Sequence, residues 1–140
     1  MDLETISAED FGRTLTGVGL NLLTRDVRAL AAFLTVTFGL TAHRLSDDFA
    51  IIRHGDALIQ LHADGTYHSN PLPQLIPENP PRGGGAQLYL FGIDPDMAVQ
   101  RAEKLGHHVI EPPANKPHGL REATILSPEG YAFSPAIPHG

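Results

Sequence analysis

The sequence predicts an α+β fold, because one pattern of strand, aspartate, helix, glycine and further strands occurs twice along the chain. Asp26 and Asp94, which each follow an apolar strand-like run and precede a helical stretch, lie 68 residues apart. The glycines that end the helical stretches and turn the last hairpins form similarly spaced pairs, Gly39 with Gly106 and Gly55 with Gly130. This internal repeat of two similar supersecondary units predicts one pseudo-symmetric domain. We expect any ligand site to lie between the sheets that the two units form.

Composition limits the class of protein. A chain of 140 residues with an apolar fraction of 41% is long enough to bury one core. The formal net charge of −6 disfavours a nucleic-acid partner, because phosphate backbones are bound by basic patches. The absence of cysteine excludes disulfides, thiolate nucleophiles and zinc–sulfur sites. The first residues do not resemble a signal peptide, and no apolar run approaches the roughly 18 residues that span a bilayer. We therefore expect a cytoplasmic protein with no nucleic-acid or membrane partner.

The chain divides into four predicted segments that together form one domain. Residues 1–15 are mixed and polar, and we expect a loosely held N-terminal extension. The first module covers residues 16–62 and the second covers residues 86–136. Residues 63–85 hold five prolines and Gly83-Gly84-Gly85 without a sustained period, which predicts a connection across an edge or mouth of the sheet.

In the first module, residues 17–23 alternate as a strand does, and Asp26 is a suitable N-cap for the helix that follows. One apolar stripe recurs at helical spacing through Val27, Leu30, Ala31, Leu34 and Phe38. Gly39 follows at the position of a left-handed C-cap. Three further strands are predicted at residues 42–45, 49–53 and 57–62.

In the second module, a strand is predicted at residues 87–91, and Asp94 with Pro95 begins a helix that Gly106 ends. A short strand at residues 107–110 precedes an expected loop at Pro112-Pro113. The last two strands, residues 121–126 and 131–134, are predicted to form a hairpin, because proline and glycine occupy the turn between them.

The order and spacing of these elements resemble the vicinal-oxygen-chelate superfamily, which includes glyoxalase I, bleomycin-resistance proteins and extradiol dioxygenases. The resemblance covers about residues 16 to 136. It is carried by Leu22-Leu-Thr-Arg-Asp26-Val, by Phe38-Gly39-Leu, and by His118-Gly-Leu-Arg121 running into Leu126-Ser-Pro-Glu-Gly130-Tyr. It implies two βαβββ modules whose curved four-stranded mixed sheets surround a cavity, usually in a homodimer.

In metal-dependent members of this superfamily, the ligands come from the first and last strands of each module. The resemblance places the corresponding positions of this chain at Gly19, Gln60, Gln87 and Ser134. Glycine has no side chain, a neutral hydroxyl is a poor ligand, and two amides carry no charge to offset the desolvation of a dication. This set, which lacks a carboxylate, predicts that the protein uses no metal and no other cofactor.

Two alternatives remain open. A rearranged set, such as His62 with Gln60 and Gln87, could hold Mg, Zn, Mn or Fe in a lyase, isomerase or dioxygenase of the same superfamily. His62 lies two residues beyond Gln60 and hence on the same strand face, and His68 and His118 are further candidates. A metal-free isomerase or hydrolase could instead use His62 or His118 as general base.

Two further positions bear on the ligand. Tyr89 shares a strand face with Gln87 and could stack on a planar ligand. Arg121 and Glu122 are adjacent on a strand, so only one of them can enter the cavity. Arg121 would bind an anionic group there, or would otherwise stabilise a turn or an interface through an ion pair.

We therefore predict a metal-free homodimer that sequesters a small organic molecule, resembling the antibiotic-resistance proteins of the bleomycin-resistance branch. We expect Gln60 and His62 to project into one cavity, which Gln87 and Tyr89 face from the second module. No catalytic residue is assigned, and the predicted ligand-binding residues are Asn21, Gln60, His62, Gln87, Tyr89, Arg121 and Ser134.

Overall fold

A computed structural model describes residues 1–67 and 70–140, and these fall into two units. The first unit comprises Met1–Thr35 and Leu40–Gln74, and the second comprises Val36–Gly39 and Leu75–Gly140. Each unit contains one four-stranded mixed sheet, so the predicted α+β class is confirmed. The joining of the two units in one domain stays a prediction.

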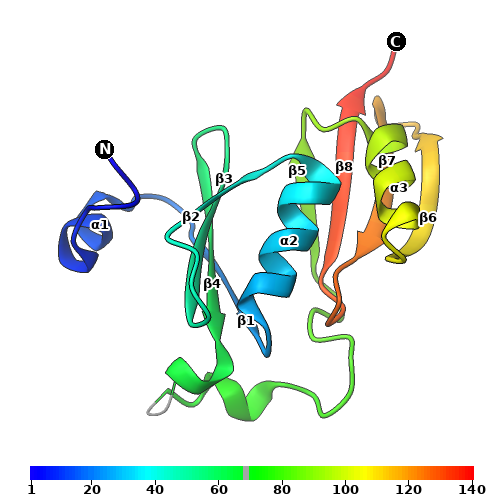
Figure 1. The fold of residues 1–140 in the computed structure, drawn as a ribbon. Coiled ribbons are helices and arrows are strands. Elements are labelled where there is room, and N and C mark those ends of the chain that lie inside the picture. Colours follow the sequence, from blue (N-terminus) through cyan, green and yellow to red (C-terminus); the bar gives the residue numbers. More distant parts are fainter. Residues whose placement is uncertain (68–69) are drawn as a thin grey trace. The chain divides into compact units, whose positions relative to one another are not determined.

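The sheet of the first unit has the strand order β1-β4-β3-β2 (Figure 1). Its strands are β1 (Leu20–Thr24), β2 (Thr41–His43), β3 (Phe49–His54) and β4 (Ala57–Ala63). Strands β1 and β4 are parallel, and the other neighbours are antiparallel. Helix α2 (Val27–Phe38) follows β1, and its first turn is capped by Asp26, whose carboxylate accepts the Ala29 amide at 3.0 Å.

The sheet of the second unit repeats this topology with the order β5-β8-β7-β6. Its strands are β5 (Gln87–Phe91), β6 (His108–Asn115), β7 (Leu120–Leu126) and β8 (Ala132–Pro138), with α3 (Pro95–Lys104) after β5. The register repeats too, because Leu20 lies beside Ile59 and the equivalent Leu88 lies beside Phe133. The internal repeat predicted from the sequence is therefore present in both order and register.

The two repeated helices end as the sequence predicts. Gly39 and Gly106, which follow α2 and α3, have φ angles of 73° and 80°. Only glycine adopts this left-handed conformation without a steric cost from its Cβ atom, so the chain can turn there into the next strand.

The N-terminal segment packs on the first sheet, contrary to the expectation of a loosely held extension. Helix α1 (Ala8–Thr14) begins at Ser7, whose hydroxyl accepts the Asp10 amide at 3.1 Å. Leu3 and Phe11 are only 4% and 6% exposed and form one cluster with Ile51 of β3. Figure 1 shows α1 and α2 on opposite sides of this sheet. The apolar side chains of the segment cover apolar strand residues and hold it there.

The alternation along β4 separates the two faces of the first sheet. Ile59 and Leu61 are buried on one face. Gln60 and His62, which alternate with them, are half-buried and point to the side of α1. We call this side the α1 face. Asn21 and Phe49 belong to the same face, because Asn21 lies beside Gln60 and Phe49 lies beside His62 in the strand register.

The expected loop at Pro112-Pro113 is wrong, because β6 continues through both prolines to Asn115. Strand β6 lies at the edge of its sheet, and its pairing with β7 shifts register on both sides of Glu111. Proline is tolerated at edges and bulges, where no ladder hydrogen bond is lost. Among the described residues, none of the helices combines the length and apolar character needed to cross a membrane.

Candidate functional site

A cavity of about 620 Å³ lies between α1 and the α1 face of the first sheet. Gln60 and His62 both line it, as their shared strand face predicts, whereas the expectation that Gln87 and Tyr89 face the same cavity stays a prediction. Helix α1 contributes residues at i, i+3 and i+4, the spacing of a single helix face, and its C-cap residue Leu15 adds a fourth. The lining residues are Ala8, Phe11, Gly12, Leu15, Arg44, Ser46, Asp48, Phe49, Gln60, His62 and Thr66.

His62 is fixed by hydrogen bonds and ring contacts. Its Nδ1 atom is hydrogen-bonded to Asn21 Oδ1, and the Asn21 amide donates from Nδ2 to the Tyr67 hydroxyl. With the Asn21 amide in this orientation its oxygen accepts, which places the proton of the neutral imidazole on Nδ1 and the lone pair on Nε2. The ring makes edge contacts with Phe49 at 4.8 Å and Tyr67 at 5.2 Å between centroids. Burial lowers the pKa of His62 below its ordinary value, which favours this neutral form.

Arg44 brings a positive charge to the cavity wall, and Asp48 brings a negative one. The backbone of Arg44 has a φ angle of 53°, a left-handed conformation that is uncommon for a residue with a side chain. The Arg44 amide donates to Glu4 Oε1 at 3.0 Å, so the N-terminal segment helps to hold this conformation. Arg44 and Tyr67 were not predicted as site residues, because neither the positive φ angle nor the contact between positions 21 and 67 is visible in a sequence pattern.

Three of the predicted residues lie together in the second unit. Gln87 Nε2 donates to Ser134 Oγ at 2.8 Å, and Ser134 Oγ shares a hydrogen bond of 2.8 Å with Thr124 Oγ1. Tyr89 lies beside Ser134 in the register of β5 and β8, and it is therefore on the same sheet face as Gln87. Both Gln87 and Tyr89 thus share a face, as period-two alternation predicts.

Glu122 is the buried charged residue of this face. Its side chain is 5% exposed, and it accepts hydrogen bonds from the Tyr89 hydroxyl at 3.0 Å and from His118 Nε2 at 2.8 Å. The hydrogen bond to Glu122, together with burial, raises the pKa of the Tyr89 hydroxyl. The sequence identified Glu122 only as the neighbour of Arg121 that would face the opposite side.

The prediction that Arg121 enters a ligand cavity is not supported by its contacts. Arg121 donates from Nε and Nη2 to the two carboxylate oxygens of Asp96 on α3, at 2.7 and 2.8 Å, and from Nη1 to Asn115 at 3.2 Å. Because strand neighbours alternate, Arg121 faces α3 and Glu122 occupies the other face. These contacts favour the structural role, one of the two alternatives that the sequence left open, and the ligand-binding role of Arg121 stays a prediction.

The residues that the resemblance places at metal positions are a poor donor set for a divalent ion. Gly19 offers no donor, and the Gln87 amide is hydrogen-bonded to Ser134. No group of three potential histidine or carboxylate ligands converges in residues 1–67 and 70–140. His68, one of the histidines considered for a rearranged metal set, lies outside the described residues.

Solved structures with the same fold span nearly the whole chain. A glyoxalase/bleomycin resistance protein/dioxygenase family enzyme from Burkholderia phytofirmans PsJN is 23% identical, with a TM-score of 0.68, and the match covers 99% of this chain and 100% of that one. A glyoxalase/bleomycin resistance protein/dioxygenase from Nocardioides is 22% identical, with a TM-score of 0.64 and coverages of 93% and 91%. A hypothetical protein from S. aureus is 18% identical, with a TM-score of 0.70 and coverages of 88% and 94%.

The chain has the glyoxalase/bleomycin-resistance fold. The resemblance inferred from the sequence is thus confirmed for the fold, whereas the metal-free branch stays a prediction. No family model matches the sequence, and no curated protein does.

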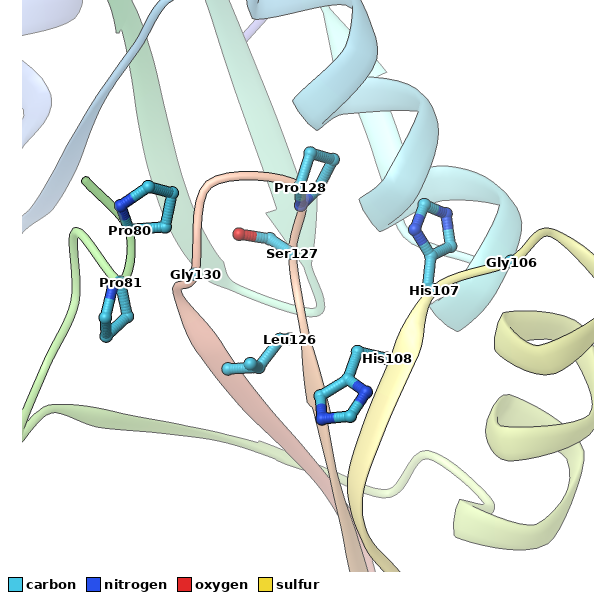
Figure 2. A pocket seen from close by; sticks show the side chains of 9 residues that line it. All are labelled: Pro80, Pro81, Gly106, His107, His108, Leu126, Ser127, Pro128 and Gly130. Carbon is cyan, nitrogen blue, oxygen red and sulfur yellow. The ribbon is translucent and has the colours of Figure 1, made fainter.

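A second hollow of this glyoxalase-fold chain, about 420 Å³, lies in the second unit beside the turn at residues 127–130 (Figure 2). His107 and His108 line it, and Figure 2 shows their imidazoles projecting in different directions. The Ser127 hydroxyl already accepts the Tyr131 amide at 3.0 Å. The cavity under α1 combines ring surfaces with the polar groups of Gln60 and His62 and is the better candidate site.

Proposed function

We propose that this protein binds a small organic molecule in the cavity under α1 and acts by sequestering it, without a metal ion. The observation that carries this proposal is the combination of a cavity of about 620 Å³ with aromatic walls and a few fixed polar groups. Ligand sites of proteins have this character, since apolar walls supply most of the affinity and a few polar groups orient the ligand.

The polar groups of the cavity have distinct roles in this proposal. The Gln60 amide both donates and accepts, and His62 Nε2 accepts once Asn21 has engaged Nδ1. Phe11 and Phe49 offer aromatic surface from α1 and β3. The unsuitable donor set at Gly19, Gln60, Gln87 and Ser134 supports a function that needs no metal, as in resistance proteins that hold a toxic compound.

The cavity itself provides the test. N-phenyl-1-naphthylamine, a neutral aromatic probe whose fluorescence rises in apolar surroundings, should bind the full chain with saturation at one equivalent. Gly12 lies on the cavity side of α1, and a Cβ atom there would meet no heavy atom within 4 Å. Gly12→Trp should therefore fill the cavity and abolish probe binding. Glu9→Trp, which places the same side chain on the exposed side of α1, should bind as the wild type does.

Two results would contradict the proposal. Equal probe binding by Gly12→Trp and the wild type would show that the probe binds elsewhere. A stoichiometric transition metal after purification from metal-supplemented medium, lost with chelator together with thermal stability, would favour the metal-dependent enzyme. We expect well under one equivalent of any such ion and a melting temperature that chelator leaves unchanged.

A metal-free enzyme is the second candidate, and the His118–Glu122 pair favours it. A buried carboxylate bound to one imidazole nitrogen orients the ring and supports its action as a general base. If the protein moves a proton of its ligand, incubation in heavy water should add deuterium to the recovered ligand with the wild type and not with His118→Gln. Unlabelled ligand in both samples would leave sequestration as the function.

A further inference from the structure

Arg44 is a cation in the wall of the cavity that no described carboxylate neutralises. The backbone amide of Arg44 donates a hydrogen bond to Glu4 Oε1. No acidic group among the described residues forms an ion pair with the Arg44 guanidinium. Asp48 also lines the cavity, and it is exposed. A guanidinium has five donors in a planar arrangement that matches the two oxygens of a carboxylate or a sulfonate.

The backbone at Arg44 is held in place by the N-terminal segment. Its φ angle of 53° is unfavourable for a residue with a Cβ atom, and Arg44 is the one described residue other than glycine with a positive φ angle. Glu4 Oε1 accepts the Arg44 amide at 3.0 Å and lies 3.4 Å from His43 Nδ1. Such conformations persist where the surroundings fix them, and they concentrate at functional positions.

The rest of the wall suits a flat, largely apolar molecule. Phe11, Phe49 and His62 supply ring surfaces, and His62 is favoured in its neutral form. The Asp48 carboxylate would repel a ligand with several negative charges. The wall therefore favours one negative charge beside Arg44 and an aromatic body against the rings.

We propose that the ligand is a planar aromatic molecule with a single acidic group, and that Arg44 binds this group. This inference rests on the proposed function, because it assigns a chemical class to the molecule that the cavity holds. Arg44 then determines specificity: it separates acidic aromatic molecules from neutral ones of the same shape.

A pair of fluorescent probes tests the assignment on the full chain. 8-Anilinonaphthalene-1-sulfonate carries one sulfonate, and N-phenyl-1-naphthylamine is the same aromatic body without it. Arg44→Gly removes the guanidinium and suits the positive φ angle, so we expect an unchanged melting temperature. It should weaken sulfonate binding at least about 10-fold, the loss expected for a charge-assisted hydrogen bond, and change binding of the neutral probe less than about two-fold.

Three further variants complete the test. Arg44→Lys should restore part of the sulfonate affinity, because it keeps the charge without the planar donors. Asp48→Asn should strengthen sulfonate binding. Arg53→Met, which removes an exposed arginine of the same sheet whose Nε donates to the Gly55 carbonyl at 3.1 Å, should change neither affinity.

The outcomes separate the two proposals. Equal effects of Arg44→Gly on both probes, or none on either, would overturn the role of Arg44 and leave the cavity as a binding site. If the wild type binds neither probe, both the proposed function and the inference are overturned.

Discussion

At the scale of the residue, Arg121 and Asp96 form a two-point ion pair that joins β7 to α3. The hydrogen bond from Arg121 lowers the pKa of the Asp96 carboxyl. We predict that Arg121→Met slightly lowers the melting temperature, returns the pKa of Asp96 towards its ordinary value and leaves probe binding unchanged. Thermal unfolding and a carboxyl NMR titration would measure these effects, with exposed Arg101→Met as the control. Lost binding at an unchanged melting temperature would show that Arg121 belongs to the site.

The ionisation of His62 predicts a dependence of stability on pH. Because burial lowers its pKa in the folded state, protonation below pH 6.5 favours the unfolded chain. The free energy of unfolding should therefore fall as the pH drops from about 6.5 towards the lowered pKa, and this group should contribute no change above that range. Melting temperatures of the wild type should fall more steeply between pH 7.5 and 5.5 than those of His62→Gln. His107, whose pKa burial also lowers, contributes equally in both proteins. Parallel curves would contradict the prediction.

The site residues differ in how far the sequence could predict them. Alternation along β4 places Gln60 and His62 in one cavity, because a strand fixes which side chains share a face. The same rule shows that Arg121 and Glu122 point apart, but it does not say which of them faces α3. Arg44 depends on a left-handed backbone that the N-terminal segment stabilises, a tertiary effect that local sequence does not encode.

At the scale of the element, α1 forms one wall of the cavity and is held by the burial of Phe11. We predict that Phe11→Ala lowers the free energy of unfolding of the first unit by about 3 kcal/mol, the usual cost of a large-to-small change in a core. Val18→Ala, at a fully exposed residue of the same unit, should change it by less than about 0.5 kcal/mol. Chemical denaturation followed by amide signals of the first unit would measure both, and equal effects would show that α1 is only loosely attached.

The elements with strong local signals were predictable and the others were not. Asp26 and Asp94 cap α2 and α3, and Gly39 and Gly106 end them, because capping depends on residues close in sequence. Helix α1 has a capping signal at Ser7. The apolar residues that bind it to the sheet are few and lie among polar residues in the sequence, so they form no recognisable apolar pattern. The prolines of β6 indicated a loop, and only its position at a sheet edge makes them compatible with a strand.

At the scale of the whole molecule, the sequence predicts a homodimer. Each sheet has two edge strands, and unpaired edges favour pairing or coverage by another chain. We expect sedimentation at micromolar concentration to give a species of twice the chain mass of 15.1 kDa. A monomer under these conditions would contradict the prediction, and comparison with Gly12→Trp would show whether association depends on the cavity.

In our proposal, the cavity between α1 and the first sheet binds an aromatic organic molecule. Amide chemical shifts of isotope-labelled full chain, recorded during titration with N-phenyl-1-naphthylamine in the presence of chelator, test it most directly. We predict that the largest shifts fall on α1, on residue 44 and on β3 and β4 around Phe49 and His62. Shifts concentrated at residues 106–108 and 126–130, where the second hollow lies, or no saturable shifts at all, would contradict it.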